Sequence, residues 1–105
     1  MGTYVATFKV SPWMRESNLE REKAGGGMAW PDDIHPIIQA HLDYEKDLKA
    51  KGKVLVGGPM AAFDWALIIY RADTLDEAVK LAENDPGYTS GILTDCKVAP
   101  WHHAL

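Results

Sequence analysis

His41 and Asp85 carry side chains of the types that can do proton chemistry. A neutral imidazole can take up a proton near pH 7 and return it, which suits general acid–base catalysis. A carboxylate beside an imidazole fixes its tautomer and stabilises its protonated form. Each residue also has a structural interpretation: His41 could be a hydrogen-bonded core histidine, and an aspartate before Pro86 often opens a turn. Helical periodicity alone favours these structural interpretations.

Glycines and aromatic residues supply candidate contacts for a ligand. The run Gly57-Gly58-Pro59 ends an apolar segment, and the backbone N–H groups of the two glycines could face a ligand oxygen. A tight exit from a strand explains this run equally well. The aromatic side chains that suit a flat cyclic substrate, although such residues more often pack in cores or interfaces, are Trp13, Trp30, Phe63, Trp65, Tyr88 and Trp101. We single out Trp13, Trp30 and Tyr88 as substrate-binding candidates.

Few residues or motifs of the sequence indicate a metal site or a nucleotide site. Cys96 is the only cysteine, so an intrachain disulfide and a Cys-based zinc site are excluded. His102 and His103 are adjacent, and His35 is predicted to point away from His41, so no third metal ligand is evident. Glycine-rich nucleotide motifs are absent from the sequence. We therefore expect no metal and no cofactor.

The elements that must position these residues can be predicted from periodicity. Residues 4–10 alternate as a strand, and residues 54–56 and 66–70 form a hairpin around 60–64. A helix opens at Pro31-Asp32-Asp33 and ends at Gly52. Its inward face carries Ile34, Ile37, Ile38, His41, Tyr44, Glu45 and Leu48.

The second half of the chain completes the order of elements. Thr74-Leu75-Asp76-Glu77 is a capping box, and the helix that it starts stops before Asp85-Pro86. Residues 92–99 form the last strand. The order is strand, helix, strand, strand, helix, strand, which predicts an α+β domain of ferredoxin-like βαββαβ topology, with a four-stranded antiparallel sheet and two helices on one face. Residues 1–105 form this single domain.

Residues 11–30 have no sustained period and contain three consecutive glycines at 25–27. A long loop of this kind in a compact domain is more often functional than idle. Because Trp13 and Trp30 bracket the glycines, we expect the loop to be mobile and to close over the pocket that holds His41.

Apolar residues on both faces of the strands predict a partner. Two helices can cover only one face of a four-stranded sheet, whereas a strand that is apolar on both faces needs both covered. A second copy of the chain is the simplest cover, so we expect a homodimer rather than a monomer with an exposed apolar sheet.

Composition excludes other classes of protein. The net charge of −4 and the lack of a basic cluster argue against nucleic-acid binding. The longest apolar run, residues 65–70, is too short to span a membrane. Residues 1–3 lack the features of a signal peptide, so we expect a cytoplasmic protein.

The motifs of residues 41–101 together resemble the YCII-related family. The pieces that carry the resemblance are His41-Leu42, Gly52-Lys53-Val54-Leu55, Gly57-Gly58-Pro59-Met60, Thr74-Leu75-Asp76-Glu77-Ala78, Asp85-Pro86, Gly91 and Val98-Ala99-Pro100-Trp101. The resemblance implies a dimeric α+β barrel with His41 and Asp85 as an acid–base pair. Dehydrochlorination of a chlorinated hydroxyquinol is an activity assigned within the family. Many members carry an arginine where this chain has Ile38, so an anionic substrate that depends on it becomes less expected.

The resulting expectation is a small cofactor-free lyase or isomerase acting on a cyclic or aromatic-derived substrate. His41 would be the base and Asp85 its orienting partner. The alternative is a non-catalytic small-molecule binding module with the same pocket. A haem or quinone monooxygenase of the same architecture is a third option, which no set of residues demands.

Overall fold

The computed structural model describes residues 1–12, 14, 16, 35–62 and 64–102. In this part of the chain the order is β1 (Gly2–Val10), α2 (His35–Ala50), β2 (Val54–Pro59), β3 (Trp65–Ala72), α3 (Leu75–Glu83), α4 (Pro86–Thr89) and β4 (Leu93–Pro100). The predicted βαββαβ order is confirmed. The one-turn helix α4 is an addition that the sequence pattern did not predict.

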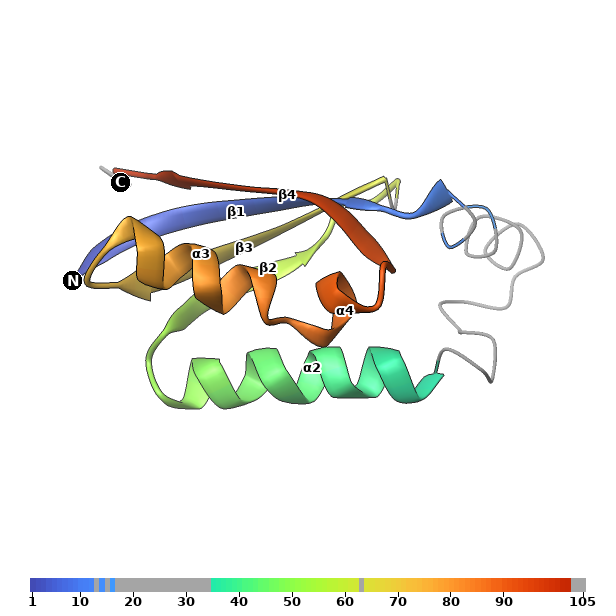
Figure 1. The fold of residues 1–105 in the computed structure, drawn as a ribbon, viewed down its shortest axis with the longest axis horizontal. Helices are drawn as coiled ribbons and strands as arrows, with labels where there is room; N and C mark the ends of the chain where they lie inside the picture. Colours follow the sequence, from blue (N-terminus) through green and yellow to red (C-terminus); the bar gives the residue numbers. More distant parts are fainter. Residues whose placement is uncertain (13, 15, 17–34, 63, 103–105) are drawn as a thin grey trace.

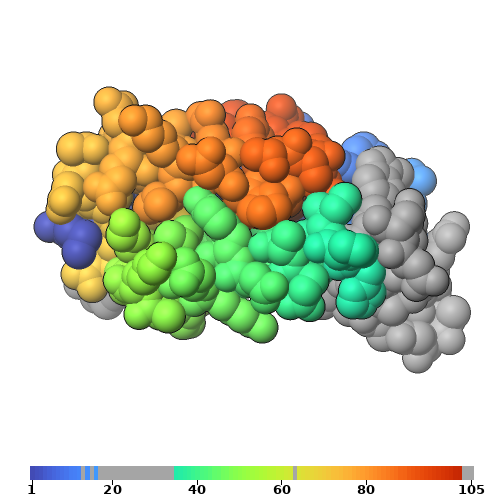
Figure 2. All heavy atoms as spheres, turned by 60° about the horizontal axis from the view of Figure 1, so that its bottom comes forward, coloured from blue at the N-terminus to red at the C-terminus, as the bar shows by residue number. Residues whose placement is uncertain are grey.

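The four strands form one antiparallel sheet in the order β2-β3-β1-β4. The helices α2, α3 and α4 all lie on the same face of this sheet, and the start of β1 and the end of β4 lie at one end of it (Figure 1). The predicted ferredoxin-like α+β fold, with its helices on one face, is therefore confirmed. Viewed from the helix side, α2 runs beside α3 and α4 (Figure 2).

Strand alternation separates the two faces as predicted. Ala6 and Phe8 are fully buried under the helices, whereas Val5 and Thr7 point to the opposite face and are only partly buried. Val56 of β2, which pairs with Ile69, is 58% exposed. No described helix covers this outer face, although Ile69 on it is only 4% exposed.

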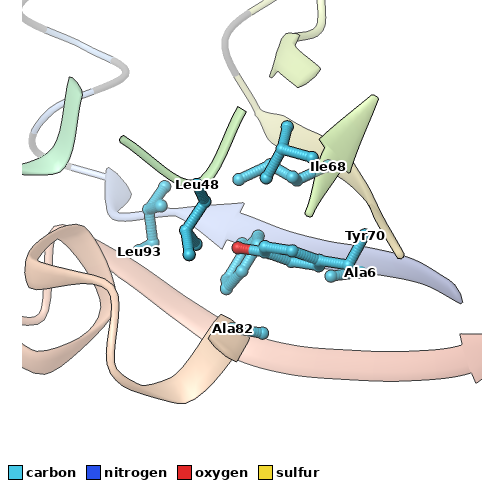
Figure 3. Close-up of a cluster of buried hydrophobic side chains, with 8 residues drawn as sticks. Ala6, Leu48, Ile68, Tyr70, Ala82 and Leu93 are labelled. Atoms are coloured by element: carbon cyan, nitrogen blue, oxygen red, sulfur yellow. The ribbon is translucent and has the colours of Figure 1, made fainter. Parts of the chain in front are cut away.

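The main core lies between the sheet and the helices. Its buried members are Ala6, Phe8, Leu48, Val54, Ile68, Tyr70, Ala82 and Leu93. Tyr70 extends across this cluster with its hydroxyl group on the side of Leu48 (Figure 3). A second, smaller cluster contains Met14, Ile38 and Ile92 and lies at the His41 end of α2.

The ends of the described helices follow the predicted chemistry. Gly52 has a φ of 76°, and the N–H groups of Gly52 and Lys53 donate to the carbonyls of Lys49 and Leu48. This left-handed glycine cap ends α2 where the sequence predicted. The predicted start of α2 at Pro31-Asp32-Asp33 lies outside the described residues.

The predicted loop at 11–30 also lies almost entirely outside the described residues. Its expected mobility and its role as a lid therefore stay predictions. Met14, one of its few described members, is 1% exposed and packs with Ile38 and Ile92.

Candidate functional site

His41 and Asp85 meet between α2 and the start of α4. The Nδ1 atom of His41 lies 2.6 Å from Oδ1 and 2.7 Å from Oδ2 of Asp85. These distances fall in the range of a direct hydrogen bond, so the predicted contact between the two residues is confirmed. The Asp85 side chain is fully buried and that of His41 is 21% exposed, so the imidazole links a buried carboxylate to a more open space.

The position of Asp85 is set by α4. Asp85 is the N-cap of this helix, and its Oδ1 accepts a hydrogen bond of 2.7 Å from the N–H group of Gly87. Pro86 occupies the first helical turn, where its missing N–H group costs nothing. The carboxylate thus receives one backbone donor and one imidazole, which suits an anion.

Gly87 permits the close approach of His41 to Asp85. A Cβ atom at position 87 would lie 3.1 Å from His41 Nδ1 and 3.2 Å from Asp85 Oδ1. Side chains in such contact would have to shift by a few tenths of an ångström. Gly87 was not among the predicted site residues, although a glycine two residues after a capping aspartate is a visible signal.

Glu45 joins the pair from the next turn of α2. His41, Glu45 and Asp85 each offer a polar atom, and these atoms all lie within 4.8 Å of one another. Oε1 of Glu45 accepts a hydrogen bond of 2.6 Å from the Tyr70 hydroxyl group, and the buried Oε2 has no hydrogen-bond partner among the described residues. The sequence placed Glu45 on the inward face of its helix but gave it no role.

Burial raises the pKa of Glu45 from 4.5 to about 8, and the neighbouring Asp85 carboxylate adds to the rise while the Tyr70 hydroxyl group opposes it. Burial also raises the pKa of Tyr44 to about 12, with the charges of Glu45 and Asp85 contributing. The Tyr44 hydroxyl group donates to the carbonyl of Leu81 at 2.6 Å and so ties α2 to α3. The pKa of Tyr70 is raised by burial first and by Glu45 next. The raised pKa of Glu45 favours its protonated, neutral form near neutral pH.

One imidazole and two carboxyl groups are donors that divalent metals accept. Two ligands of one ion, each at about 2.0–2.2 Å from it and at right angles or wider, lie roughly 2.8 Å or more apart. The 2.6 Å between His41 and Asp85 is a hydrogen-bond distance. The arrangement is that of a hydrogen-bonded pair, and we assign no metal to it.

A pocket of about 430 Å³ opens beside this group, between α2 and the sheet. Its lining is mostly apolar and comes from Val10, Met14, Ile38, His41, Leu42, Glu45, Lys46, Lys49, Val54, Gly57, Gly58, Pro59, Ala66, Ile68, Ile92 and Leu93. An apolar cavity with a few polar groups at one place is the usual form of a small-molecule site.

The pocket contains some of the predicted substrate-binding residues. Gly57, Gly58 and Pro59 are part of its lining. A Cβ atom on Gly57 would lie 2.9 Å from a side-chain carbon of Ile68, so a larger residue there would force a shift in the pocket wall. Whether these residues bind a substrate stays a prediction.

The remaining candidates lie elsewhere. Tyr88 is not in the described lining; its ring packs on Phe8 with 6.1 Å between ring centroids. Trp13 and Trp30 lie outside the described residues, as does His103. Cys96 is half-buried beside the main core, and burial raises its pKa to about 11, so its thiol is unreactive near neutral pH.

Residues 19–102 match the YCII-related domain, and the chain therefore belongs to the YCII-related family. The resemblance that the sequence predicted is confirmed. No curated protein is detectably similar to the chain in sequence.

Two solved structures are similar in fold. The first is 5-chloro-2-hydroxyhydroquinone dehydrochlorinase (TftG) from Burkholderia phenoliruptrix AC1100, in complex with 2,5-dihydroxybenzoquinone. It is 24% identical, has a TM-score of 0.61, and the match covers 97% of this chain and 95% of that protein. The second is described as a putative antibiotic biosynthesis monooxygenase from Deinococcus radiodurans; it is 15% identical, has a TM-score of 0.47, and the match covers 100% and 94% of the two chains. TftG supports the α+β fold assigned above.

No helix among the described residues is both long and apolar enough to cross a membrane.

Proposed function

We propose that the protein is a cofactor-free enzyme that moves protons on a small cyclic or aromatic-derived substrate, as a lyase of the dehydrochlorinase type or as an isomerase. The observation that carries this proposal is the 2.6 Å hydrogen bond between His41 and Asp85 at the wall of an apolar pocket. Family membership and the fold shared with TftG support the proposal.

The roles of the two residues follow from their contacts. Asp85 engages Nδ1 of His41, which leaves Nε2 as the ring nitrogen that can take a proton from a substrate. The buried carboxylate then stabilises the imidazolium ion that forms. In a dehydrochlorination, the proton would pass to His41, the electron pair of the broken bond to hydrogen would form a new double bond in the substrate, and chloride would leave with the electron pair of the C–Cl bond.

The first test uses 5-chloro-2-hydroxyhydroquinone, the compound that appears in the name of TftG, and measures chloride release by the purified protein. We expect His41→Ala to lower the rate by about 100-fold or more, which is the usual contribution of a general base. Asp43→Asn is the matched control, because Asp43 is exposed on the same helix and its side chain accepts a hydrogen bond from Gln39, away from the pocket lining. Equal rates for His41→Ala and the unchanged protein would contradict the proposal.

The alternative is a non-catalytic binding module that uses the same pocket. It would bind 2,5-dihydroxybenzoquinone or related rings with no turnover, and His41 would act only as a hydrogen-bond partner. Calorimetric binding without chloride release or isomerisation would favour this alternative.

We also propose that the protein is a homodimer that works in the cytoplasm. The outer sheet face supports the dimer, because it carries Val5, Val56 and Leu67 and no described helix covers it (Figure 1). The single cysteine is compatible with a reducing compartment. Sedimentation should give about twice the chain mass of 11.6 kDa, and Leu67→Lys should shift the protein toward the monomer. A monomeric unchanged protein would contradict the dimer.

A further inference from the structure

Glu45 has the geometry of a second functional group in the pocket. It lies one helical turn after His41 on α2, lines the same pocket, and brings a carboxyl oxygen within 4.8 Å of the polar atoms of His41 and Asp85. One of its oxygens is held by the Tyr70 hydroxyl group, while the other is buried without a partner among the described residues. A buried polar atom without a partner is costly, so a ligand that satisfies it would gain affinity.

We propose that Glu45 is a proton donor of this pocket, which gives a hydrogen bond or a proton from Oε2 to an oxygen of a bound phenol or quinone-like ring. The inference rests on the proposed function and extends it from one acid–base residue to two. His41 would take a proton from the ligand while Glu45 supplies one to the oxygen on which negative charge develops.

The charges around Glu45 favour this role. The groups that face it are His41 and Tyr44 from α2, Tyr70 from β3 and Asp85 from the start of α4. Asp85 receives an N–H group from Gly87 and the imidazole of His41, whereas Glu45 receives, among the described residues, only the Tyr70 hydroxyl group. Two carboxyl groups in one buried cluster do not both ionise easily, so the one with fewer donors keeps its proton. The raised pKa of Glu45, about 8, agrees with this reasoning.

The proton balance of an isomerisation shows what each residue would contribute. Nε2 of His41 removes a proton from a ring carbon, and the electron pair moves onto the neighbouring carbonyl oxygen. Oε2 of Glu45 gives its proton to that oxygen, so the intermediate is a neutral enol. Glu45 then takes this proton back while His41 delivers its own to a different carbon, and both residues return to their first state.

A titration without ligand tests the first requirement. In protein labelled with ¹³C at the glutamate carboxyl groups, we expect one carboxyl signal to titrate near pH 8. Glu45→Gln should remove this signal. The hydrogen bond from Tyr70 lowers the pKa of Glu45, so Tyr70→Phe, which removes that bond, should move the midpoint of the signal upward. The exposed-carboxylate control Asp43→Asn should leave it unchanged. If every glutamate carboxyl titrates below about pH 6, the inference is overturned.

A binding experiment tests the second requirement, with 2,5-dihydroxybenzoquinone as the probe. We expect the affinity of the unchanged protein to fall about 10-fold as the pH rises from 7 to 9, because ionised Glu45 repels the ligand oxygen and can no longer donate. Glu45→Gln keeps an N–H donor that cannot ionise, so its affinity should not show this fall. Changes in the ionisation of the probe affect its binding to both proteins equally, so they cancel in the ratio of the two affinities. Identical pH profiles for the two proteins, or no binding at millimolar probe, would overturn the inference.

The two proposals fail in different ways. One possible result is turnover that depends on His41, together with identical pH profiles of binding for Glu45→Gln and the unchanged protein. This result would rule out the role of Glu45 as a proton donor and leave the proposed enzymatic function standing. A Glu45-dependent binding profile without any turnover would keep Glu45 as a ligand donor and leave the protein as a binding module.

Discussion

The helices α3 and α4 begin in the same way but with different consequences. At α3, the Thr74 side chain accepts a hydrogen bond of 3.1 Å from the N–H group of Glu77, and both residues are at the surface or only partly buried. At α4, Asp85 accepts from the N–H group of Gly87 at 2.7 Å and is fully buried. Only the second cap has a further partner, His41 of α2. A helix cap therefore becomes part of a site when packing brings a titratable residue of another helix against it.

The surroundings of the two caps explain this difference. Thr74 precedes a helix that packs on β3 and β4, and its capping box is completed by Glu77, which accepts from the N–H group of Asp73. Asp85 stands where α4 packs against α2. The glycine at position 87 leaves room for the imidazole, which a larger residue would crowd.

Replacing Asp85 should have the largest effect. Asp85→Ala removes the cap of α4 and the partner of His41 together, and we expect the free energy of unfolding to fall by about 2–4 kcal/mol, measured by urea denaturation. Asp85→Asn keeps an acceptor for Gly87 but presents an amide to His41, so it should cost less stability while changing the imidazole tautomer, which ¹⁵N NMR reports. Equal stability of Asp85→Ala and the unchanged protein would refute the importance of this cap.

Gly87→Ala should have an intermediate effect. The new Cβ atom would lie 3.1 Å from His41 Nδ1 and 3.1 Å from a methyl carbon of Leu93, so we expect a loss of about 1–2 kcal/mol from crowding. The ¹⁵N spectrum of His41 should change, since the contact with Asp85 must lengthen. Gly58→Ala is the matched control, because a Cβ atom there would have nothing within 4 Å. If both substitutions behave alike, the space at Gly87 does not matter for the His41 contact.

Thr74→Ala should have the smallest effect and should be confined to α3. Loss of the side-chain acceptor should lower the free energy of unfolding by about 1 kcal/mol. The His41 spectrum and any turnover should stay the same, since Thr74 has no described contact with the pocket. A change in the His41 signals would show that the two caps are coupled, which the comparison between them does not predict.

Much of the fold could be predicted from the sequence because the signals are local. Alternation in β1, the capping box at Thr74 and the left-handed glycine at position 52 each depend on neighbours in the chain, and the structure confirms them. The helix α4 was missed because four residues are too few to show a period. Asp85-Pro86 was interpreted as the end of one helix, although Asp85 also caps the next.

The sequence by itself determined the topology, the placement of His41 and Glu45 on one helix face, and the family. Only the tertiary structure decided that Asp85 reaches His41, because nothing in a strand–helix order fixes how the start of α4 packs against α2. It also decided that the pKa of Glu45 is raised. A carboxyl group at the surface ionises near pH 4, and what changes the state of Glu45 is burial beside Asp85, which exists only after the chain has folded.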